Sequence, residues 1–337
     1  MKVSFVIAGN LFALSGGPAV VSDGAWRRHM TEGAAAVRKG AELEAEENFQ
    51  RAIAEASSPH HGLTKRVLSL RYLAILYVAA GRNVEAAHVF ENALAIVRSK
   101  RKDVDAKEQS TLLIDAAMFF NGTRRLALAA QLYREWIELG ERLWGDAERL
   151  ADGHRAIAGI MHSMGRAAEA EDAYRRVIAI MTRKWGESSL DVAAALSSLA
   201  DFLTEEGRLE DAQAVYREMI RIHSLAGGPV DEAALRCDLA LLLSWDGKEQ
   251  AAEEEIRRAE KVVEGSLGPG HEAYRSVLRA RRSFLLNEGR FEEAENLSQD
   301  TTVLEVEPTE FRGWHLDEIS VFPPSYPPTL PGVLIED

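Results

Sequence analysis

The side chains that could do chemistry are few, and their spacing does not assemble a reactive site. His154 and His162 are eight residues apart, about two turns of a helix, which is too far for both imidazoles to bind one metal ion. Glu253 and Glu255 could act as paired carboxylates, but they belong to the stretch EEEIRR, which is typical of a solvated helix face. The single cysteine, Cys237, lies in the apolar run AALRCDLALLL, so neither an internal disulfide nor a cysteine-based zinc site can form.

Sequence motifs that would bind a cofactor or activate a nucleophile are absent. The chain has no HExxH metal site, no serine nucleophile elbow, no acidic calcium loop and no glycine-rich phosphate loop. We therefore predict that the protein is not an enzyme and has no catalytic residue, no cofactor and no metal site. An active site would require a pocket formed where the proline-rich C-terminal tail folds onto the rest of the chain.

The composition is that of a folded, acidic protein. Of the 337 residues, 46% are hydrophobic and 28% are charged, and 40 basic against 53 acidic residues give a formal net charge of −13. This balance disfavours nucleic acid as the main ligand, because duplex binding requires basic groups that neutralise phosphates. No run of 18 or more apolar residues occurs, so we predict no membrane-spanning helix.

A repeated local pattern organises most of the chain. Glycines recur in the same setting every 40 to 43 residues, at Gly40, Gly81, Gly122, Gly165, Gly207, Gly247 and Gly289. An alanine lies five residues after each glycine, or seven after Gly122. These alanines are Ala45, Ala86, Ala129, Ala170, Ala212, Ala252 and Ala294. Four positions beyond each alanine stand Phe49, Phe90, Tyr133, Tyr174, Tyr216, Ile256 and Ser298. Twelve positions before six of the alanines stands a small residue, namely Gly33, Ala74, Ala117, Ala158, Ala200 and Ala240.

This spacing predicts pairs of closely packed helices. Apolar residues recur three and four apart on both sides of each glycine, so two helices meet at a turn. Glycine suits the end of the first helix because it adopts the left-handed conformation without a Cβ clash. The small residue and the alanine let the two backbones approach, and the aromatic residue fills the gap to the next pair. The residues that best define the pattern are Gly81, Ala86, Gly165, Ala170, Tyr174, Gly207, Ala212, Tyr216 and Gly289.

The pattern resembles the tetratricopeptide repeat family, in particular the longer repeats of the kinesin-light-chain type, with a period near 42 residues. The resemblance is carried by LAILYVAAGRNVEAAHVFENALAI (Leu73–Ile96), by LADFLTEEGRLEDAQAVYREMIRI (Leu199–Ile222) and by the linkers KWGESSLDVA (Lys184–Ala193) and SLGPGHEAY (Ser266–Tyr274). HEAT repeats have an overlapping period, but they lack a glycine turn followed by an alanine and an aromatic residue four apart.

The resemblance implies an all-α fold, a right-handed superhelical solenoid of about seven helix-turn-helix units, because no single pair could bury its apolar face alone. The predicted units are 26–64, 65–107, 108–149, 150–190, 191–230, 231–271 and 272–305. The sequence departs from the pattern in three places. The third unit has two extra residues after Gly122, and the sixth has Ile256 in place of an aromatic residue. The seventh has Arg282 and Ser298 at core positions, which suggests a terminal unit that faces water.

The resemblance also implies a binding surface, since in this family the first helices of the units line a concave wall. Counting back from each repeat alanine predicts the residues of this surface, which we name the predicted groove. They are Arg71, Ile75, Val78, Thr111, Met118, Asn121, Asp152, Arg155, His162, Ser197, Asp201, Thr204, Cys237, Leu241, Ser244, Arg279 and Ser283.

The groove arginines leave two interpretations open. Arginine binds carboxylates through paired donors, so Arg71, Arg155 and Arg279 could bind a partner that carries acidic groups. Alternatively, they pair with acids of the chain itself, such as Asp152 or Asp201, and maintain the curvature of the array. The predicted function is a non-enzymatic scaffold or adaptor that binds an extended peptide segment of a protein partner. The alternative is a regulatory module that senses a ligand or peptide and controls a partner protein.

The two ends of the chain differ from the repeats. Residues 1–25 combine a basic start with a mostly apolar stretch, which predicts either a secretory signal peptide or an N-terminal cap on the first unit. We favour the signal, and hence export to the periplasm or the exterior, over a cytoplasmic location. Residues 306–337 contain six prolines, which predict a non-helical tail. Part of this tail could pack on the last repeats, or PPSY (Pro323–Tyr326) could be a ligand for WW domains.

Overall fold

The computed structural model describes residues 24–56, 62–145 and 148–299, and every regular element within these ranges is helical. The prediction of an all-α fold built from about seven helix-turn-helix units is confirmed. Contacts between residues divide the described chain into an N-terminal segment that ends at Ile160 and a C-terminal segment that begins at Met161. Residues 1–23, which include most of the predicted signal peptide or cap, and the predicted tail lie outside the described residues.

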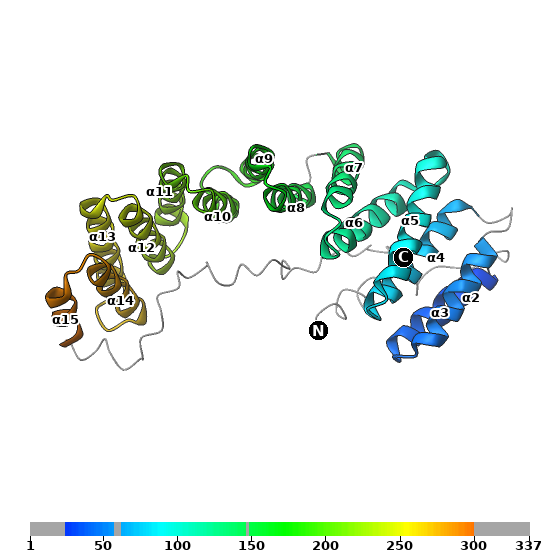
Figure 1. Ribbon diagram of the computed structural model, residues 1–337, viewed down its shortest axis with the longest axis horizontal. Helices are drawn as coiled ribbons and strands as arrows, with labels where there is room; N and C mark the ends of the chain where they lie inside the picture. Colours follow the sequence, from blue (N-terminus) through cyan, green and yellow to red (C-terminus); the bar gives the residue numbers. More distant parts are fainter. Residues whose placement is uncertain (1–23, 57–61, 146–147, 300–337) are drawn as a thin grey trace, which may run out of the picture. The chain divides into compact units, whose positions relative to one another are not determined.

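The N-terminal segment consists of consecutive antiparallel helix pairs, coloured from blue to green in Figure 1. Its elements are α2 (Gly24–Arg38), α3 (Glu42–Ala56), α4 (Leu63–Ala79), α5 (Asn83–Ser99), the short 3-10 helix η3 (Arg101–Asp103), α6 (Ala106–Gly122), α7 (Leu126–Trp144) and most of α8 (Arg149–Ser163). Within pairs, α2 packs on α3, α4 on α5 and α6 on α7. Between pairs, α3 packs on α4, and both α4 and α5 pack on α6.

The C-terminal segment repeats the same arrangement, from green to orange in Figure 1. After the last turn of α8 it contains α9 (Ala167–Trp185), α10 (Leu190–Glu205), α11 (Leu209–Ala226), α12 (Pro229–Trp245), α13 (Glu249–Leu267), α14 (Glu272–Asn287) and α15 (Phe291–Gln299). Each of α9 to α14 packs on the next helix along the chain, and α12 also packs on α14. None of the described helices in either segment has the length and apolarity needed to cross a bilayer.

Small residues let the two helices of a pair approach closely, as the spacing predicts. A Cβ atom added to Gly33 would lie only 2.7 Å from the ring of Phe49, so a larger residue there would displace the ring. In the next pair, Ala74 and Ala86 are fully buried. Phe90 is also buried, and its ring centre lies 5.3 Å from that of Phe119 on α6. The aromatic residue therefore fills the space between neighbouring pairs.

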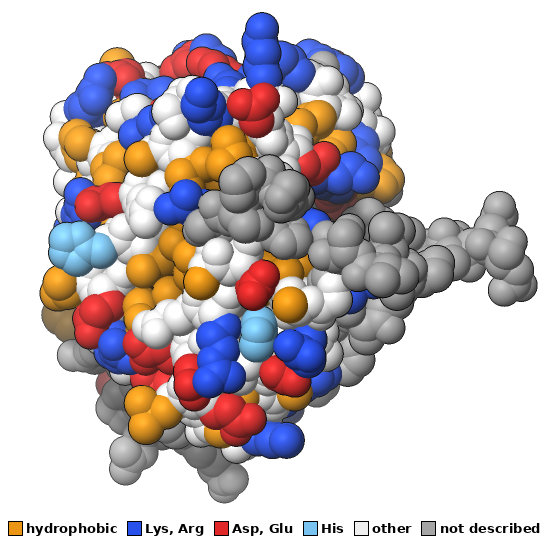
Figure 2. Space-filling model, turned by 90° about the vertical axis from the view of Figure 1, so that its right-hand side faces the viewer, with side chains coloured by type: hydrophobic (Ala, Val, Ile, Leu, Met, Phe, Trp, Pro, Cys, Tyr) orange, Lys and Arg blue, Asp and Glu red, His pale blue; other side chains and the backbone are white. Residues whose placement is uncertain are grey.

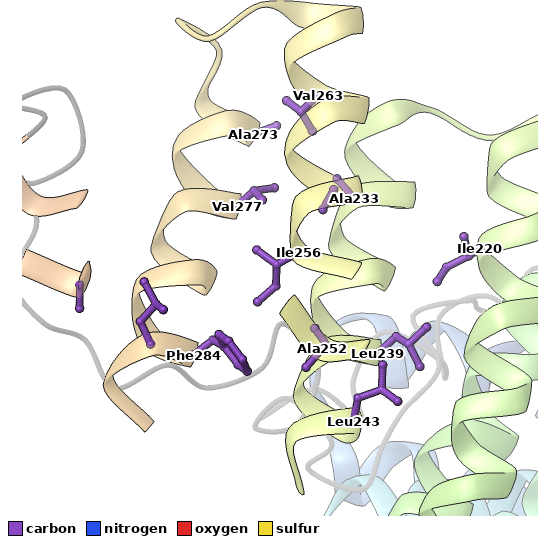
Figure 3. Close-up of a cluster of buried hydrophobic side chains, with 14 residues drawn as sticks. Ile220, Ala233, Leu239, Leu243, Ala252, Ile256, Val263, Ala273, Val277 and Phe284 are labelled. Carbon is purple, nitrogen blue, oxygen red and sulfur yellow. The ribbon is translucent and has the colours of Figure 1, made fainter. Parts of the chain in front are cut away.

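The core of the C-terminal segment continues through α12, α13 and α14 to α15. Figure 3 shows the side chains of Leu243, Ala252, Ile256 and Phe284 in this cluster. Ile256, which replaces the aromatic residue of the other repeats, is buried. An aliphatic side chain therefore performs the same packing role in the sixth pair. In the seventh pair Arg282 is half-buried, and the side chain of Ser298 lies outside the described part of the chain.

The turn inside each pair has one recurring geometry. At Gly81 the backbone φ is 73°, in the left-handed region. The N–H of Gly81 donates to the carbonyl of Val78, and the N–H of Arg82 donates to the carbonyl of Tyr77 at 2.8 Å. These two bonds satisfy carbonyls at the helix end in the Schellman arrangement. Gly40, Gly165, Gly207, Gly247 and Gly289 also have φ near 70°.

The third pair corrects one detail of the sequence pattern. We expected Gly122 to be its turn glycine, but Gly122 ends α6, and Arg124 has the left-handed conformation, with φ of 61°. Arg124 is five residues before Ala129, the same interval that separates Gly81 from Ala86. The two extra residues after Gly122 therefore move the turn away from the glycine.

Candidate functional site

All the residues of the predicted groove lie on the first helices of their pairs, α4, α6, α8, α10, α12 and α14. Most of them are half-buried, which leaves part of each side chain accessible. Three residues are exceptions: Met118 is 52% exposed, Asp152 is also exposed, and Arg71 is only 5% exposed. Figure 2 views the molecule from the side of α2 and α3, where basic and acidic side chains lie close together with hydrophobic side chains between them.

Arg71 forms the centre of a buried cluster of charges in the N-terminal segment. Its Nε donates to Glu108 Oε1 and its Nη1 donates to Asp115 Oδ2, both at 2.8 Å. The arginine lies on α4 and both carboxylates lie on α6. The cluster therefore joins the first helices of two consecutive pairs.

The charges of this cluster do not cancel, because one guanidinium faces two carboxylates. Burial raises the pKa of the Glu108 carboxyl and of the Asp115 carboxyl, although Arg71 acts in the opposite direction. Burial alone would lower the pKa of Arg71, but the charges of Asp115 and Glu108 outweigh it and raise that pKa. The guanidinium thus stays charged, and the carboxyls take up protons more readily than in water.

The other two groove arginines are also bonded to acids of the chain. Arg155 Nη1 lies 2.6 Å from Asp152 Oδ1, one turn away on α8. Arg279 Nη2 lies 2.6 Å from Glu272 Oε1 on α14. A ligand carboxylate at any of the three arginines would have to compete with a carboxylate already in place.

The residues predicted from the sequence do not include the two acidic residues of the buried cluster. Glu108 and Asp115 are seven residues apart, two turns along one helix face, and they follow Arg71 by 37 and 44 residues. Because these intervals bracket the repeat period, acids placed about one period after a first-helix arginine are the signal that could have identified them.

A second set of ion pairs, which we name the inter-repeat ladder, joins consecutive second helices. In each rung, a basic residue at the start of one second helix binds a carboxylate on the second helix before it. The rungs are Arg82–Glu46 at 2.6 Å, Arg125–Glu91 at 2.6 Å, Arg208–Glu171 at 2.5 Å, Lys248–Glu210 at 3.5 Å and Arg290–Glu253 at 2.9 Å. In the sequence, the inter-repeat ladder is marked by a basic residue directly after most turn glycines, as in GR or GK.

The ladder is not continuous along the sequence. Glu46, Glu171 and Glu253 each directly follow a repeat alanine. In the third repeat this position is Ala130, which has no carboxylate. The basic residue of the fourth repeat, Arg166, bonds to Glu169 on its own helix.

The nucleophilic and metal-binding groups of the described chain are shielded or lie apart from one another. Burial raises the pKa of the Cys237 thiol, which therefore stays protonated and unreactive near neutral pH. Burial also raises the pKa of Tyr133 to about 12. Within the described ranges, no three His, Cys, Asp or Glu side chains gather closely enough to hold a metal ion.

The helix pairs, their glycine turns and their close-packed alanines define the chain as a helical-repeat protein. Residues 149–224 match the family model described as tetratricopeptide repeat. The matched stretch of the chain therefore consists of tetratricopeptide repeats. Proteins with this repeat generally act as non-enzymatic scaffolds that bind protein partners, and no enzyme family is indicated.

Solved structures with this fold resemble the chain at low sequence identity. The C-terminal part of a TPR repeat-containing protein from Cytophaga hutchinsonii is 14% identical, with 83% of this chain and 95% of that chain covered and a TM-score of 0.54. BtubC (BKLC) from P. vanneervenii is 18% identical, with 74% and 94% covered and a TM-score of 0.45. Kinesin-light-chain TPR-like repeats from Podosopora anserina are 16% identical, with 57% and 92% covered and a TM-score of 0.45. A comparison with curated proteins found no match.

Proposed function

We propose that the protein is a non-enzymatic scaffold that binds an extended segment of a protein partner across the first helices of its repeats. The observation that supports this most is the face formed by α4 and α6, which pack against each other as first helices of consecutive pairs. Ile75, Met118 and Asn121 lie on these helices at predicted groove positions, outside the buried core. Methionine is flexible and polarizable, which suits a surface that accommodates an apolar ligand group.

The partner segment is recognised at this face mainly through uncharged groups. The three groove arginines are each bonded to a carboxylate of the chain, so they contribute less to an acidic ligand than free arginines would. An apolar side chain on Met118, with a peptide amide on Asn121, fits the groups that α6 offers. A partner with acidic groups would first have to displace Asp152 or Glu272.

A peptide-display selection on the full-length chain tests this function. Peptides enriched on the wild type should bind at least tenfold more weakly to Met118→Glu and to Asn121→Ala. The matched control is Val84→Glu, which places the same charge on the second helix α5 at a residue that is 69% exposed. Enriched peptides that bind the groove variants as tightly as the control would refute the proposed surface.

The same library separates the uncharged ligand from an acidic one. If acidic peptides are enriched and lose their binding in Arg155→Gln, the arginines are the recognition groups, and the uncharged contact is wrong. A small metabolite that raises the melting temperature by several degrees in a ligand screen would favour the regulatory alternative, in which the repeats sense a ligand and control a partner.

A further inference from the structure

His162 lies between two carboxylates of the next helix pair in the C-terminal segment. Its Nδ1 is 3.3 Å from Glu205 Oε2, and its Nε2 is 3.3 Å from Glu206 Oε1. The histidine is in the last turn of α8, and the two acids are at the end of α10. The ring of Phe202 meets the imidazole edge-on, with centres 5.2 Å apart and planes at 90°, which fixes the ring between the two acids.

The number of hydrogen bonds in this arrangement depends on the protonation of the imidazole. A neutral imidazole has one N–H donor and one acceptor nitrogen, whereas an imidazolium has two N–H donors. Carboxylates only accept. Both contacts can therefore be hydrogen bonds at the same time only when His162 carries two protons.

Among the described residues, the ion-pair partner of the two carboxylates is His162, and they have no permanent counter-ion of the kind found in the next repeat. Negative charge at the C-terminal end of a helix is unfavourable, because the exposed carbonyls there carry partial negative charge. At the end of α12, Asp246 is compensated by Lys248 Nζ at 2.6 Å, which is charged throughout the neutral range. At the end of α10, the group in the corresponding role is His162.

The cations of the neighbouring turns are bonded to other acids. Arg166, at the start of α9, bonds to Glu169. Arg208, at the start of α11, bonds to Glu171 and Asp211. Among the described residues, the charged groups that form ion pairs with His162 are Glu205 and Glu206.

We propose that His162, Glu205 and Glu206 form a proton-operated clasp that fastens the fourth helix pair to the fifth. Histidine is the side chain whose charge ordinarily changes between about pH 5 and pH 8. On mild acidification the imidazolium bonds both acids and the junction tightens. As the pH rises, one bond is lost and the adjacent carboxylates are left to repel each other. The clasp makes the stiffness of this part of the array respond to pH, whichever partner the protein binds.

Thermal unfolding of the full-length protein at about pH 5.5 to pH 8 tests the clasp. The melting temperature of the wild type should exceed that of His162→Gln at the acidic end, and the difference should shrink toward pH 8. In a protein that also carries Glu205→Gln and Glu206→Gln, the change His162→Gln should no longer affect the melting temperature at the acidic end. His88→Gln is the control, because it removes an exposed histidine on α5 and leaves the clasp intact. Identical pH profiles for the wild type and His162→Gln would overturn the proposal.

Hydrogen exchange gives a local readout that a general loss of stability would not mimic. Protection of the last turn of α10, corrected for the intrinsic exchange rate, should rise about two- to fivefold on acidification in the wild type, the effect of one partly exposed ion pair. It should stay flat in His162→Gln and in the double carboxylate variant. An equal rise in all three proteins would show that another group responds to pH, and would also overturn the proposal.

Discussion

Arg82 and Glu46 join the first two helix pairs, with Nη1 of the arginine 2.6 Å from Oε2 of the glutamate. The glutamate also accepts a hydrogen bond of 2.7 Å from the hydroxyl of Tyr77, and the guanidinium lies 4.2 Å from the centre of the tyrosine ring. The Arg82 hydrogen bond, supported by Tyr77, lowers the pKa of the Glu46 carboxyl despite its partial burial. This rung of the inter-repeat ladder is thus a small network rather than an isolated surface pair.

We expect Arg82→Met to lower the melting temperature, and the loss to be smaller in high salt because exposed charges are screened. Glu46→Gln should have a similar effect. The double variant should lower the melting temperature by less than the sum of the two single changes, as is expected for coupled partners. The control is Arg51→Met, whose exposed pair with Glu47 lies within a single helix and should contribute little. Strictly additive losses for Arg82 and Glu46 would mean that the rung contributes no coupling.

Acid should weaken the same rung. Because the folded pKa of Glu46 lies below its ordinary value, the stabilisation is present above about pH 4 and is lost as the pH falls through the folded pKa. The melting temperatures of the wild type and of Glu46→Gln should therefore converge below that pH. A difference that stays constant down to pH 2 would contradict this assignment.

In the turn of the third helix pair, one substitution should stabilise the protein. Arg124 has a φ of 61°, which costs a residue with a Cβ atom about 1 kcal/mol relative to glycine. Arg124→Gly should therefore stabilise the protein by roughly that amount, whereas Gly207→Ala should destabilise it by a similar amount, since φ at Gly207 is 71°. Denaturant unfolding of both variants measures the two changes. Loss of stability in Arg124→Gly would show that its side chain contributes more than the strain it carries.

The sequence predicts the helix pairs well because three independent constraints repeat in register. Glycine is needed at the turn, a small residue where backbones approach, and a large residue in the gap, as the buried Ala74, Ala86 and Phe90 show. The turn at Arg124 could not be predicted by looking for glycine. A short insertion moved the turn away from Gly122, and only counting back from Ala129 locates it.

The groove positions could be assigned to first helices, but their electrostatic state could not be read from the sequence. Arg71 has the same position in its repeat as Arg155 and Arg279, yet it is buried between Glu108 and Asp115 on the next first helix. Which acid meets a given arginine depends on how consecutive helices pack, and the repeat pattern alone does not fix this. The binding role of the groove stays a prediction.

Truncation of the aromatic residue between two pairs should be among the most damaging changes. Phe90 is buried, and its ring centre lies 5.3 Å from that of Phe119 and 6.4 Å from that of Phe120. Phe90→Ala should cost about 3–5 kcal/mol of unfolding free energy, since such a cavity removes contacts on every side. Val84→Ala, at an exposed position of the same helix, should change it by less than about 0.5 kcal/mol. Equal effects of the two changes in denaturant unfolding would refute this packing role.

The buried cluster at Arg71 should be the most sensitive electrostatic site. Arg71→Met leaves Glu108 and Asp115 buried without a cation, which should cost about 3–5 kcal/mol near pH 7. The loss should be smaller at pH 4 to 5, because carboxyls that lack a counter-ion in a buried site accept protons. A loss that is independent of pH would indicate that Arg71 acts through packing alone.

Glu108→Gln tests how the stability contributed by Glu108 depends on pH while Arg71 and Asp115 are both present. Because burial raises the folded pKa of Glu108 above its ordinary value near 4, this carboxyl favours the folded state most at low pH. That contribution declines as the pH rises through the folded pKa. Glutamine resembles the protonated acid, so the variant should gain in melting temperature relative to the wild type as the pH rises from 4 to 8. The reverse slope would mean that the bond to Arg71 outweighs burial and that the pKa of Glu108 is lowered in the folded protein.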